Sequence, residues 1–321
     1  NSESPLTPEI VEGYSAMTAL ITEKKLRELD GRTEQEAADF RRASRPFSYN
    51  AGFTLAESGQ FFVLTDDELA TELGLTIHGA IGDVFVHADG YKKSISNPGV
   101  GNYITMGKAM GQARRLIGEH ALQNGSFVQA HGSSTPQNRV TESHILSELA
   151  TAFGIRQWPV TAVKAHLGHS IAAASADQLL MTLGTWAHGI IPGITTATEV
   201  ADDVHQQGLD ILLNHQPVNA DALPLAFINA KGFGGNNASG FIISPQQTHK
   251  LLASKYSGQE WKAYLTRNEY IRQAALDYDA KASAGETSVR YVFGEGVMDA
   301  EDLDIRDTRI RIKGWEHDIK L

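Results

Sequence analysis

The chain has 321 residues, of which 41% are hydrophobic, so it can bury one large core or two smaller ones. Its formal net charge of −10 argues against nucleic-acid binding, because surfaces that contact phosphates carry a basic excess. The lack of cysteine excludes disulfides, thiolate metal sites and a cysteine nucleophile among these residues. No apolar run reaches the roughly 20 residues of a membrane span and the first residues are unlike a targeting peptide, so we expect a cytoplasmic location and no membrane partner.

Predicted helices and strands alternate along the first 245 residues, beginning with an amphipathic helix that opens at Thr7-Pro8-Glu9. The patterns then predict a strand over 52–65, an acidic helix from Asp66, a strand over 75–89, a long helix over 101–123, a strand over 126–130 and a helix over 137–153. They continue with a strand over 159–163, a small-residue helix after Gly168, a strand over 223–230, a glycine-rich turn over 232–237 and a strand over 238–244. This alternation indicates a layered α/β architecture.

The composition changes near Pro245. Lys, Arg, Asp and Glu make up 25 of the 76 residues from Gln246 to Leu321, but only 41 of the 245 residues before them. Apolar residues at helical spacing, from Leu251 to Leu265, predict that the start of this tail packs on the body of the protein. Two later stretches, 288–293 and 309–315, have the pattern of short strands.

The stretch VKAHLGHSIAAASA, residues 163–176, places Lys164 and His169 at the start of a helix made of small residues. The partial positive charge at a helix start disfavours a protonated imidazole there, and a nearby lysine acts in the same direction. We therefore expect His169 to be neutral at pH 7 and able to form hydrogen bonds. Taken alone, the pair is more typical of a buried structural histidine beside a surface lysine than of a functional site.

Two further segments have polar or glycine-rich loops directly after an apolar strand. The loop HGSSTP begins at His131 and carries hydroxyl side chains. The turn GFGGNN carries one large apolar residue, Phe233, among glycines whose backbone N–H groups can approach a substrate oxygen. Because strand ends in α/β layers are where ligands bind, these loops are candidates for one site.

The order HGSSTP, KAHLGH with its small-residue helix, and GFGGNN resembles the β-ketoacyl-[acyl-carrier-protein] synthases, the condensing enzymes of fatty acid and polyketide synthesis. Their motifs are HGTxTP, KSxxGH and GFGG, and the segment SRPFSYNAGF also resembles theirs. The resemblance covers roughly residues 8–245. It implies an α/β, thiolase-like layered α-β-α-β-α fold. This chain would supply mainly the C-terminal half in residues 1–245, with 246–321 as a charged extension that packs on it.

The resemblance assigns decarboxylation to four polar residues. His131 and His169 match the histidines that contact the malonyl thioester carbonyl and stabilise the enolate formed when carbon dioxide leaves. Lys164 matches a lysine that holds charge and geometry around them, and Glu142 matches a glutamate in the same network. Neutral imidazoles suit this role because they donate hydrogen bonds without strongly binding the departing carboxylate.

It also assigns substrate contacts. Phe233 matches a gate residue whose backbone N–H completes an oxyanion hole, and Ser133 and Thr135 match hydroxyls that bind the pantetheine arm. The glycines of the turn that would form this oxyanion site are Gly232, Gly234 and Gly235.

The family nucleophile is a cysteine in the N-terminal half, and these residues contain none. The resemblance therefore implies decarboxylative Claisen condensation only together with a Cys-bearing N-terminal half. The implied partners are that half, acyl carrier protein with phosphopantetheine-linked acyl and malonyl groups, and a second copy in a homodimer. No cofactor and no metal are expected. His166 and His169 form an H-x-x-H pattern, but a third ligand is missing and Lys164 would repel a cation.

The sequence departs from the family pattern at three places, one of which is Asn50-Ala51-Gly52 in place of the usual Arg-Asp-Gly. Arg139 and Gln178 stand where many members have an aspartate and a glutamate that order the site. In some members a monovalent cation lies near these acids, so the two replacements put such a site in doubt here.

Two alternative functions stay open. The chain could be a non-catalytic partner subunit like the chain-length factors, although such partners have little reason to keep His131, Lys164 and His169. A thiolase is the other alternative, disfavoured because thiolases use one histidine and a second cysteine near the C-terminus.

Overall fold

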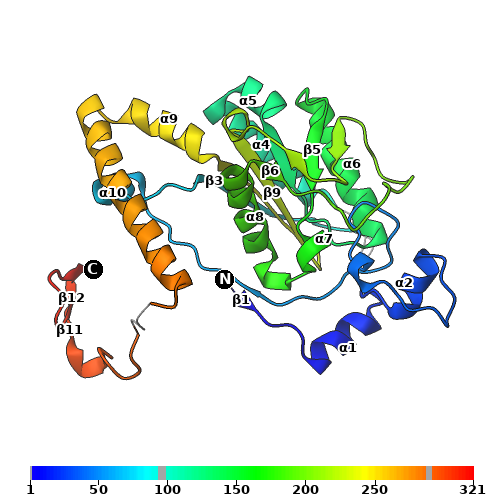
Figure 1. The fold of residues 1–321 in the computed structure, drawn as a ribbon, viewed down its shortest axis with the longest axis horizontal. Coiled ribbons are helices and arrows are strands. Elements are labelled where there is room, and N and C mark those ends of the chain that lie inside the picture. Colours follow the sequence, from blue (N-terminus) through cyan, green and yellow to red (C-terminus); the bar gives the residue numbers. More distant parts are fainter. Residues whose placement is uncertain (1, 93–98, 287–290) are drawn as a thin grey trace. The chain divides into compact units, whose positions relative to one another are not determined.

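The computed structural model describes residues 2–92, 99–286 and 291–321 (Figure 1). By its contacts the chain divides into two units, Asn1–Arg267 and Asn268–Leu321. The first unit is built around a six-stranded sheet with the strand order β3-β10-β9-β4-β5-β7. The predicted α/β class is confirmed.

The sheet is mixed. Strand β4 runs parallel to both β9 and β5, and β5 runs parallel to β7, whereas β10 is antiparallel to β9 and β3. Parallel neighbours need a crossover connection, and the helix between β4 and β5 provides one. The strands are β3 (Ala80–Ala88), β4 (Ser126–Gln129), β5 (Trp158–Thr161), β7 (Leu209–Ile211), β9 (Leu225–Gly232) and β10 (Asn236–Ile243).

Helices cover both faces of this sheet (Figure 1). Val128 and Phe227 belong to one core with α4 and α6, whereas their neighbours Phe127 and Ala226 belong to a second core with Trp186 of α8. Since successive strand residues point to opposite faces, the two cores lie on opposite sides of the sheet. The helices are α4 (Gly101–Ile117), α6 (Pro136–Ala152) and α8 (Ala174–His188).

Two element predictions in the first unit are wrong. The single helix predicted over 101–123 is two helices, because Gly118, at φ 101°, ends α4 and α5 (Glu119–Asn124) starts again after it. The strand predicted over 52–65 is reduced to β2 (Ser58–Gly59), paired with β1 (Ser2–Glu3). The remainder is irregular chain, and Phe61 on it is 98% exposed, so the apolar pattern there does not mark a buried strand.

Short elements complete the first unit. Before β3 these are α1 (Pro8–Ala16), α2 (Glu23–Leu29), the 3-10 turn η1 (Phe40–Arg42) and α3 (Asp67–Leu73). After β5 they are α7 (Lys164–Leu167), η2 (Ile171–Ala173), β6 (Ile190–Ile191), β8 (Gln216–Pro217), η3 (Ala220–Ala222) and α9 (Pro245–Lys255). Helices α1 and α3 begin where predicted, and they are capped by the Thr7 hydroxyl and the Asp66 carboxylate.

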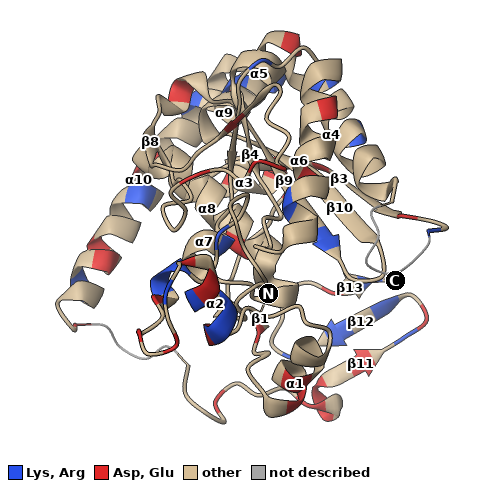
Figure 2. Ribbon diagram, turned by 90° about the vertical axis from the view of Figure 1, so that its right-hand side faces the viewer, with Lys and Arg blue, Asp and Glu red and all other residues tan. Residues whose placement is uncertain are grey.

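The last long helix, α10 (Gly258–Ser283), begins in the first unit, where Tyr264 is fully buried and donates a hydrogen bond to the carbonyl of Leu75 at 3.1 Å. Both acidic and basic residues occur along this helix and along α2 (Figure 2). The contacts divide the chain after Arg267, so the boundary predicted at Pro245 stays a prediction.

The second unit contains a three-stranded antiparallel sheet of β11 (Leu303–Ile305), β12 (Arg309–Ile312) and β13 (Ile319–Lys320), preceded by η4 (Ala300–Asp302). The strand predicted over 309–315 is thus present in its first four residues. Of the stretch 288–293, residues 288–290 lie outside the described part of the chain, and 291–293 form no strand. Within the described ranges, no helix is long and apolar enough to cross a membrane.

Candidate active site

The three motifs of the sequence meet at one edge of the sheet. His131 follows β4, Lys164 follows β5 and Phe233 follows β9. These strands are parallel neighbours, so their carboxyl ends lie at the same edge. The fold thereby brings together side chains that are up to about a hundred positions apart in the sequence.

His131 and His169 lie next to each other. Their ring centroids are 5.3 Å apart and the rings are nearly perpendicular. The Nδ1 atom of His131 accepts a hydrogen bond from the backbone N–H of Lys231 at 3.3 Å, and Nδ1 of His169 accepts one from the N–H of Ile171 at 3.0 Å. An Nδ1 that accepts carries no proton, which places the ring proton of each neutral histidine on Nε2 and leaves that N–H available to a substrate oxygen.

Both histidines are held neutral. Burial lowers the pKa of His131 well below its ordinary value, and the positive charges of Lys164 and Lys231 add to this. Burial, followed by the charge of Lys164, lowers the pKa of His169 to about 2. From the sequence, we attribute the neutral state of His169 partly to the start of the helix that follows it. That helix start is not adjacent to His169, because α8 begins only at Ala174. Exclusion of water is the larger cause.

The backbone around His169 is fixed by an extended segment. The N–H of His169 donates to the carbonyl of Thr54 at 2.7 Å, and its carbonyl accepts from the N–H of Ala56 at 3.0 Å. Gly168 has φ +76°, and a Cβ there would approach the Thr54 carbonyl to 3.0 Å. The glycine of the KAHLGH motif is therefore required for this close approach.

Lys164 is buried, and its ammonium group donates to the backbone carbonyl of His131 at 2.6 Å. The carbonyl of Lys164 accepts from the hydroxyl of Ser44 at 2.7 Å. Burial lowers the pKa of Lys164 to about 8, against the charges of Glu142 and Asp177, which raise it. Lys164 thus fixes the loop that carries His131 and keeps positive charge beside both imidazoles.

Glu142 on α6 is fully buried and accepts four hydrogen bonds. Its Oε1 accepts from the N–H of His131 and the amide of Asn229, each at 2.7 Å. Its Oε2 accepts from the N–H of Gly132 and the amide of Asn138, each at 2.9 Å. This carboxylate therefore connects β4, β9 and α6, and its role is to hold the backbone of His131 in place.

The hydroxyls predicted to bind pantetheine lie at the start of α6. The hydroxyl oxygens of Ser133 and Thr135 are 3.1 Å apart, and that of Thr135 also accepts from the N–H of Asn138 at 3.4 Å as the helix cap. Thr135 thus has a structural function whether or not it contacts substrate. Gly132, at φ +47°, leaves no room for a Cβ, which would come within 2.4 Å of Ala162.

Phe233 lies in the hairpin turn between β9 and β10 and is 52% exposed. Its ring is 5.9 Å from the ring of Tyr14 and 6.5 Å from that of Phe53, and Phe53 lies 5.3 Å from His169. An aromatic group therefore extends from the surface to the histidines. The turn glycines Gly234 and Gly235 have φ values of 86° and 90°, and Gly232 ends β9.

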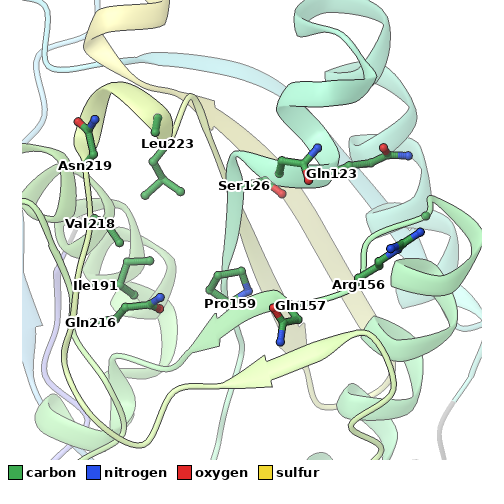
Figure 3. A pocket seen from close by; sticks show the side chains of 13 residues that line it. Gln123, Ser126, Arg156, Gln157, Pro159, Ile191, Gln216, Val218, Asn219 and Leu223 are labelled. Carbon is green, nitrogen blue, oxygen red and sulfur yellow. The ribbon is translucent and has the colours of Figure 1, made fainter.

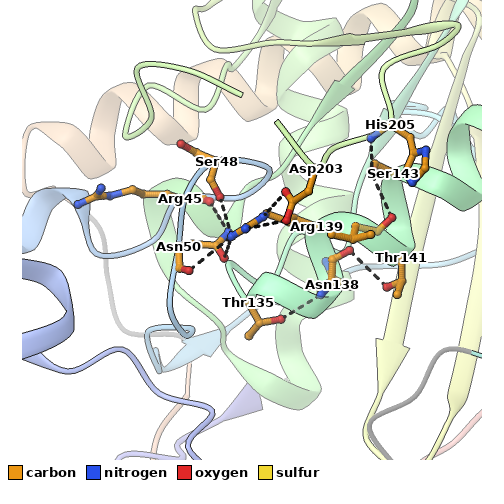
Figure 4. A network of polar contacts seen from close by, with 11 residues as sticks. Arg45, Ser48, Asn50, Thr135, Asn138, Arg139, Thr141, Ser143, Asp203 and His205 are labelled. Carbon is orange, nitrogen blue, oxygen red and sulfur yellow. Dashed lines mark hydrogen bonds and ion pairs between the residues drawn. The ribbon is translucent and has the colours of Figure 1, made fainter. Parts of the chain in front are cut away.

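Arg139, at the position that departs from the family pattern, clamps two loops together (Figure 4). Its guanidinium binds both carboxylate oxygens of Asp203 at 2.8 Å and the side-chain oxygen of Asn50 at 3.1 Å. The amide of Asn50 donates to the carbonyl of Arg45, whose N–H donates to Ser134 at 2.7 Å in the HGSSTP loop.

A separate hollow lies at the opposite end of β4 and β5 (Figure 3). Its lining includes Ser126 at the start of β4 and Pro159 near the start of β5, with Arg156, Gln216 and Leu223. None of the predicted site residues lines it. We therefore place the candidate active site at the histidine end of the sheet.

Sequence reasoning missed several groups that hold this site, namely Asn138, Asn229, Ser44 and the backbone of Lys231. Of these residues, only Asn229 could have been recognised from the sequence, because it is a polar residue within the apolar run LAFINA of a buried strand. His166, three residues before His169, is apart from the pair, and its ring nitrogen Nε2 bonds to the carbonyl of Gly193 at 2.8 Å.

Comparison with known proteins identifies relatives over nearly the whole chain. Residues 78–198 match the family described as beta-ketoacyl synthase, C-terminal domain. The chain is 53% identical over 315 residues to the β-ketoacyl-[acyl-carrier-protein] synthase FabY of Pseudomonas aeruginosa, a match that covers 98% of this chain and 49% of that protein. It is 27% identical over 241 residues to a 3-oxoacyl-[acyl-carrier-protein] synthase 2 of Vibrio cholerae, covering 74% of this chain and 53% of that protein.

Solved structures agree. A crystal structure of the P. aeruginosa ketosynthase FabY matches with a TM-score of 0.94 at 51% identity, covering all of this chain and 50% of that one. A complex of a type II polyketide ketosynthase with its carrier protein, AntDE:AntF, matches with a TM-score of 0.61 at 22% identity and supports the fold alone. The expected thiolase-like fold is confirmed, and the chain spans about half the length of the curated relatives that it matches.

Proposed function

We propose that this chain, whose residues 78–198 match the C-terminal domain of β-ketoacyl synthases, supplies the decarboxylation half of the active site of a condensing enzyme in fatty acid synthesis. The proposed reaction is the decarboxylative Claisen condensation of malonyl-acyl carrier protein with an acyl thioester. His131 and His169 would hold the malonyl thioester, with Lys164 and Glu142 fixing their positions.

One observation carries the proposal. Two buried imidazoles, with ring centroids 5.3 Å apart, both accept backbone N–H bonds on Nδ1 and so keep a proton on Nε2. Two neutral N–H donors beside each other can bind one carbonyl oxygen on which negative charge develops.

The chemistry then follows from charge. As the bond between the malonyl α-carbon and its carboxylate breaks, carbon dioxide leaves and the electron pair forms the enolate, whose oxygen takes the negative charge. Hydrogen bonds from His131 and His169 to that oxygen strengthen as this charge grows, so they stabilise the transition state more than the ground state. The enolate carbon next attacks the acyl thioester carbonyl, and the acyl group's sulfur leaves as thiolate.

The nucleophilic thiol has to come from residues other than these 321, since they contain no cysteine. We propose that a Cys-bearing N-terminal half of the same enzyme provides it, that acyl carrier protein delivers both substrates on phosphopantetheine, and that the enzyme is a homodimer. Ser133 and Thr135 would contact the pantetheine arm, and Phe233 with the turn of Gly232, Gly234 and Gly235 would gate the oxyanion site.

The test uses the complete natural protein with His131→Ala and His169→Ala. Release of carbon dioxide from malonyl carrier protein should fall by about 100-fold or more in each variant. Acylation of the cysteine, followed by mass spectrometry, should stay measurable because it forms no enolate. His166→Ala is the matched control, since it removes an imidazole from the same motif outside the histidine pair.

Normal decarboxylation in either variant would remove that histidine from the mechanism. A different outcome is that the wild-type protein changes the product of a separate ketosynthase while neither loading acyl groups nor releasing carbon dioxide. That outcome would favour the chain-length-factor function.

A further inference from the structure

The side-chain nitrogen of Gln178 lies within hydrogen-bond distance of three backbone carbonyls at once. Nε2 is 2.8 Å from the oxygen of Ala130 and 3.0 Å from those of Gln129 and Asn229. The side chain comes from α8 and is fully buried. Three acceptors around one nitrogen identify that atom as the NH₂ group of the amide.

These carbonyls mark the point where two strands separate. β4 and β9 pair up to Gln129 and Ile228, after which the N–H of Ala130 turns to the carbonyl of Thr161, while β9 continues its pairing with β10. We call this point of separation the β4–β9 fork, and Gln178 bridges it from the α8 side of the sheet. On the other face the side chain of Asn229 bridges it through Glu142.

The fork controls the orientation of His131. Just beyond it, the N–H of Lys231 on β9 donates to Nδ1 of His131 on the loop after β4. That hydrogen bond determines which ring nitrogen carries the proton, so the separation of the two strand ends must be held closely. Gln178 does this without contacting the imidazole.

Three carbonyl oxygens at 2.8–3.0 Å around one point also resemble the ligands of a potassium ion. The family resemblance implies a monovalent cation near this helix in some members, but a cation fits this chain poorly. The point is occupied by Nε2, and the carboxylates of the site are bound elsewhere, Glu142 by four N–H groups and Asp177 by Ser58, Ser170 and Gln60.

The charges around this point also disfavour a bound cation. Among the described residues, the side-chain oxygens of Gln129 and Gln178 are buried and have no hydrogen-bond partner, but they are neutral. Buried Lys164 adds a positive charge to the same network. A buried cation without a carboxylate partner is costly, and a neutral amide avoids that cost.

We propose that Gln178 is a positioning residue whose amide takes the place of a monovalent cation at the β4–β9 fork, so that the alignment of His131 does not require potassium or sodium. The link to His131 rests on the proposed function, whereas the independence from cations does not.

The experiment compares the complete wild-type protein with Gln178→Met and Gln178→Glu. Thermal unfolding midpoints are measured in potassium chloride, sodium chloride and choline chloride at equal ionic strength. We expect the wild-type midpoint to agree within about 1 °C in all three salts. Gln178→Met, similar in length but without the NH₂ group, should unfold about 5 °C lower in every salt. Gln178→Glu should be more stable in potassium chloride than in choline chloride, because its carboxylate faces the three carbonyls and needs a cation between them.

Gln157→Glu is the matched control, an exposed position where the same change should give no difference between salts. A wild-type midpoint that rises in potassium or sodium chloride would overturn the proposal, and so would an unchanged midpoint in Gln178→Met. Decarboxylation measured in parallel should fall at least about 10-fold in Gln178→Met while KM for malonyl carrier protein changes little. A loss of stability without any loss of decarboxylation would refute the link to His131 alone.

Discussion

At the scale of single residues, the neutral state of the two histidines connects the proposed catalysis with stability. The pKa of His169 is about 2 in the folded protein, against an ordinary value of 6.5, because the ring is buried beside Lys164. Between these values the unfolded chain binds a proton that the folded protein does not. The contribution to stability is therefore complete above pH 6.5 and is lost as the pH falls below it.

This predicts a specific acid sensitivity. Between pH 7 and pH 5 the complete protein should lose about 2 kcal/mol of unfolding free energy on account of His169. His169→Gln, which cannot take up a proton, should show a smaller loss by that amount when urea unfolding is compared at the two pH values.

His188→Gln is the control, because this histidine is exposed at the end of α8 and its removal should leave the difference between the two pH values unchanged. An identical pH dependence in wild type and His169→Gln would show that His169 binds a proton in the folded state.

The sequence could predict the residues that we propose carry the chemistry, but only part of what positions them. His131, Lys164 and His169 lie in short motifs after predicted strands, so strand order alone brings them together. Asn229 and Gln178 act where β4 and β9 separate, and which carbonyls remain unpaired there is decided by the sheet register. No local pattern encodes that register.

At the scale of elements, periodicity predicted the strands and helices whose apolar faces are buried on the sheet, including β4, α6, β9 and β10. It failed where backbone conformation decides the outcome. Gly118 ends a helix whose apolar spacing continues past it, and Gly168 permits the turn between α7 and η2. Among the described residues, the segment 52–65 pairs with a strand only at Ser58 and Gly59 and otherwise forms single bridges at Phe53 and Leu55.

The helix α6 makes a separate prediction through Glu142. Glu142→Gln replaces one acceptor oxygen with an NH₂ group that faces N–H donors, so the two buried hydrogen bonds which that oxygen accepted are lost. Unfolding free energy should fall by about 2–3 kcal/mol, as measured by urea denaturation.

The same helix offers the control. Glu148 is 65% exposed on its side chain, and Glu148→Gln should change the unfolding free energy by less than about 0.5 kcal/mol. If the two variants were equally stable, Glu142 would not be the group that ties α6 to the loop of His131.

At the scale of the whole first unit, one face of the sheet is only partly covered. Val84 and Val86 of β3 lie opposite Gly240 and Ala238 of β10, on the face where α8 packs against Ile242. They are nevertheless 60% and 74% exposed. Adjacent exposed β-branched side chains on a sheet edge are unusual for a solvent-facing surface.

The last prediction follows from this surface. A polypeptide limited to residues 1–321 should bind the hydrophobic dye anilinonaphthalene sulfonate and should show no condensing activity, since it presents the β3 face and contains no cysteine. Val84→Thr combined with Val86→Thr should lower the dye fluorescence, because threonine keeps the shape of valine but replaces a methyl group with a hydroxyl.

Addition of a Cys-bearing N-terminal half should lower the dye fluorescence further and restore acyl loading on that cysteine alone. A monomeric polypeptide of these residues that binds no dye would show a self-sufficient domain, and would favour the non-catalytic partner subunit over the condensing enzyme.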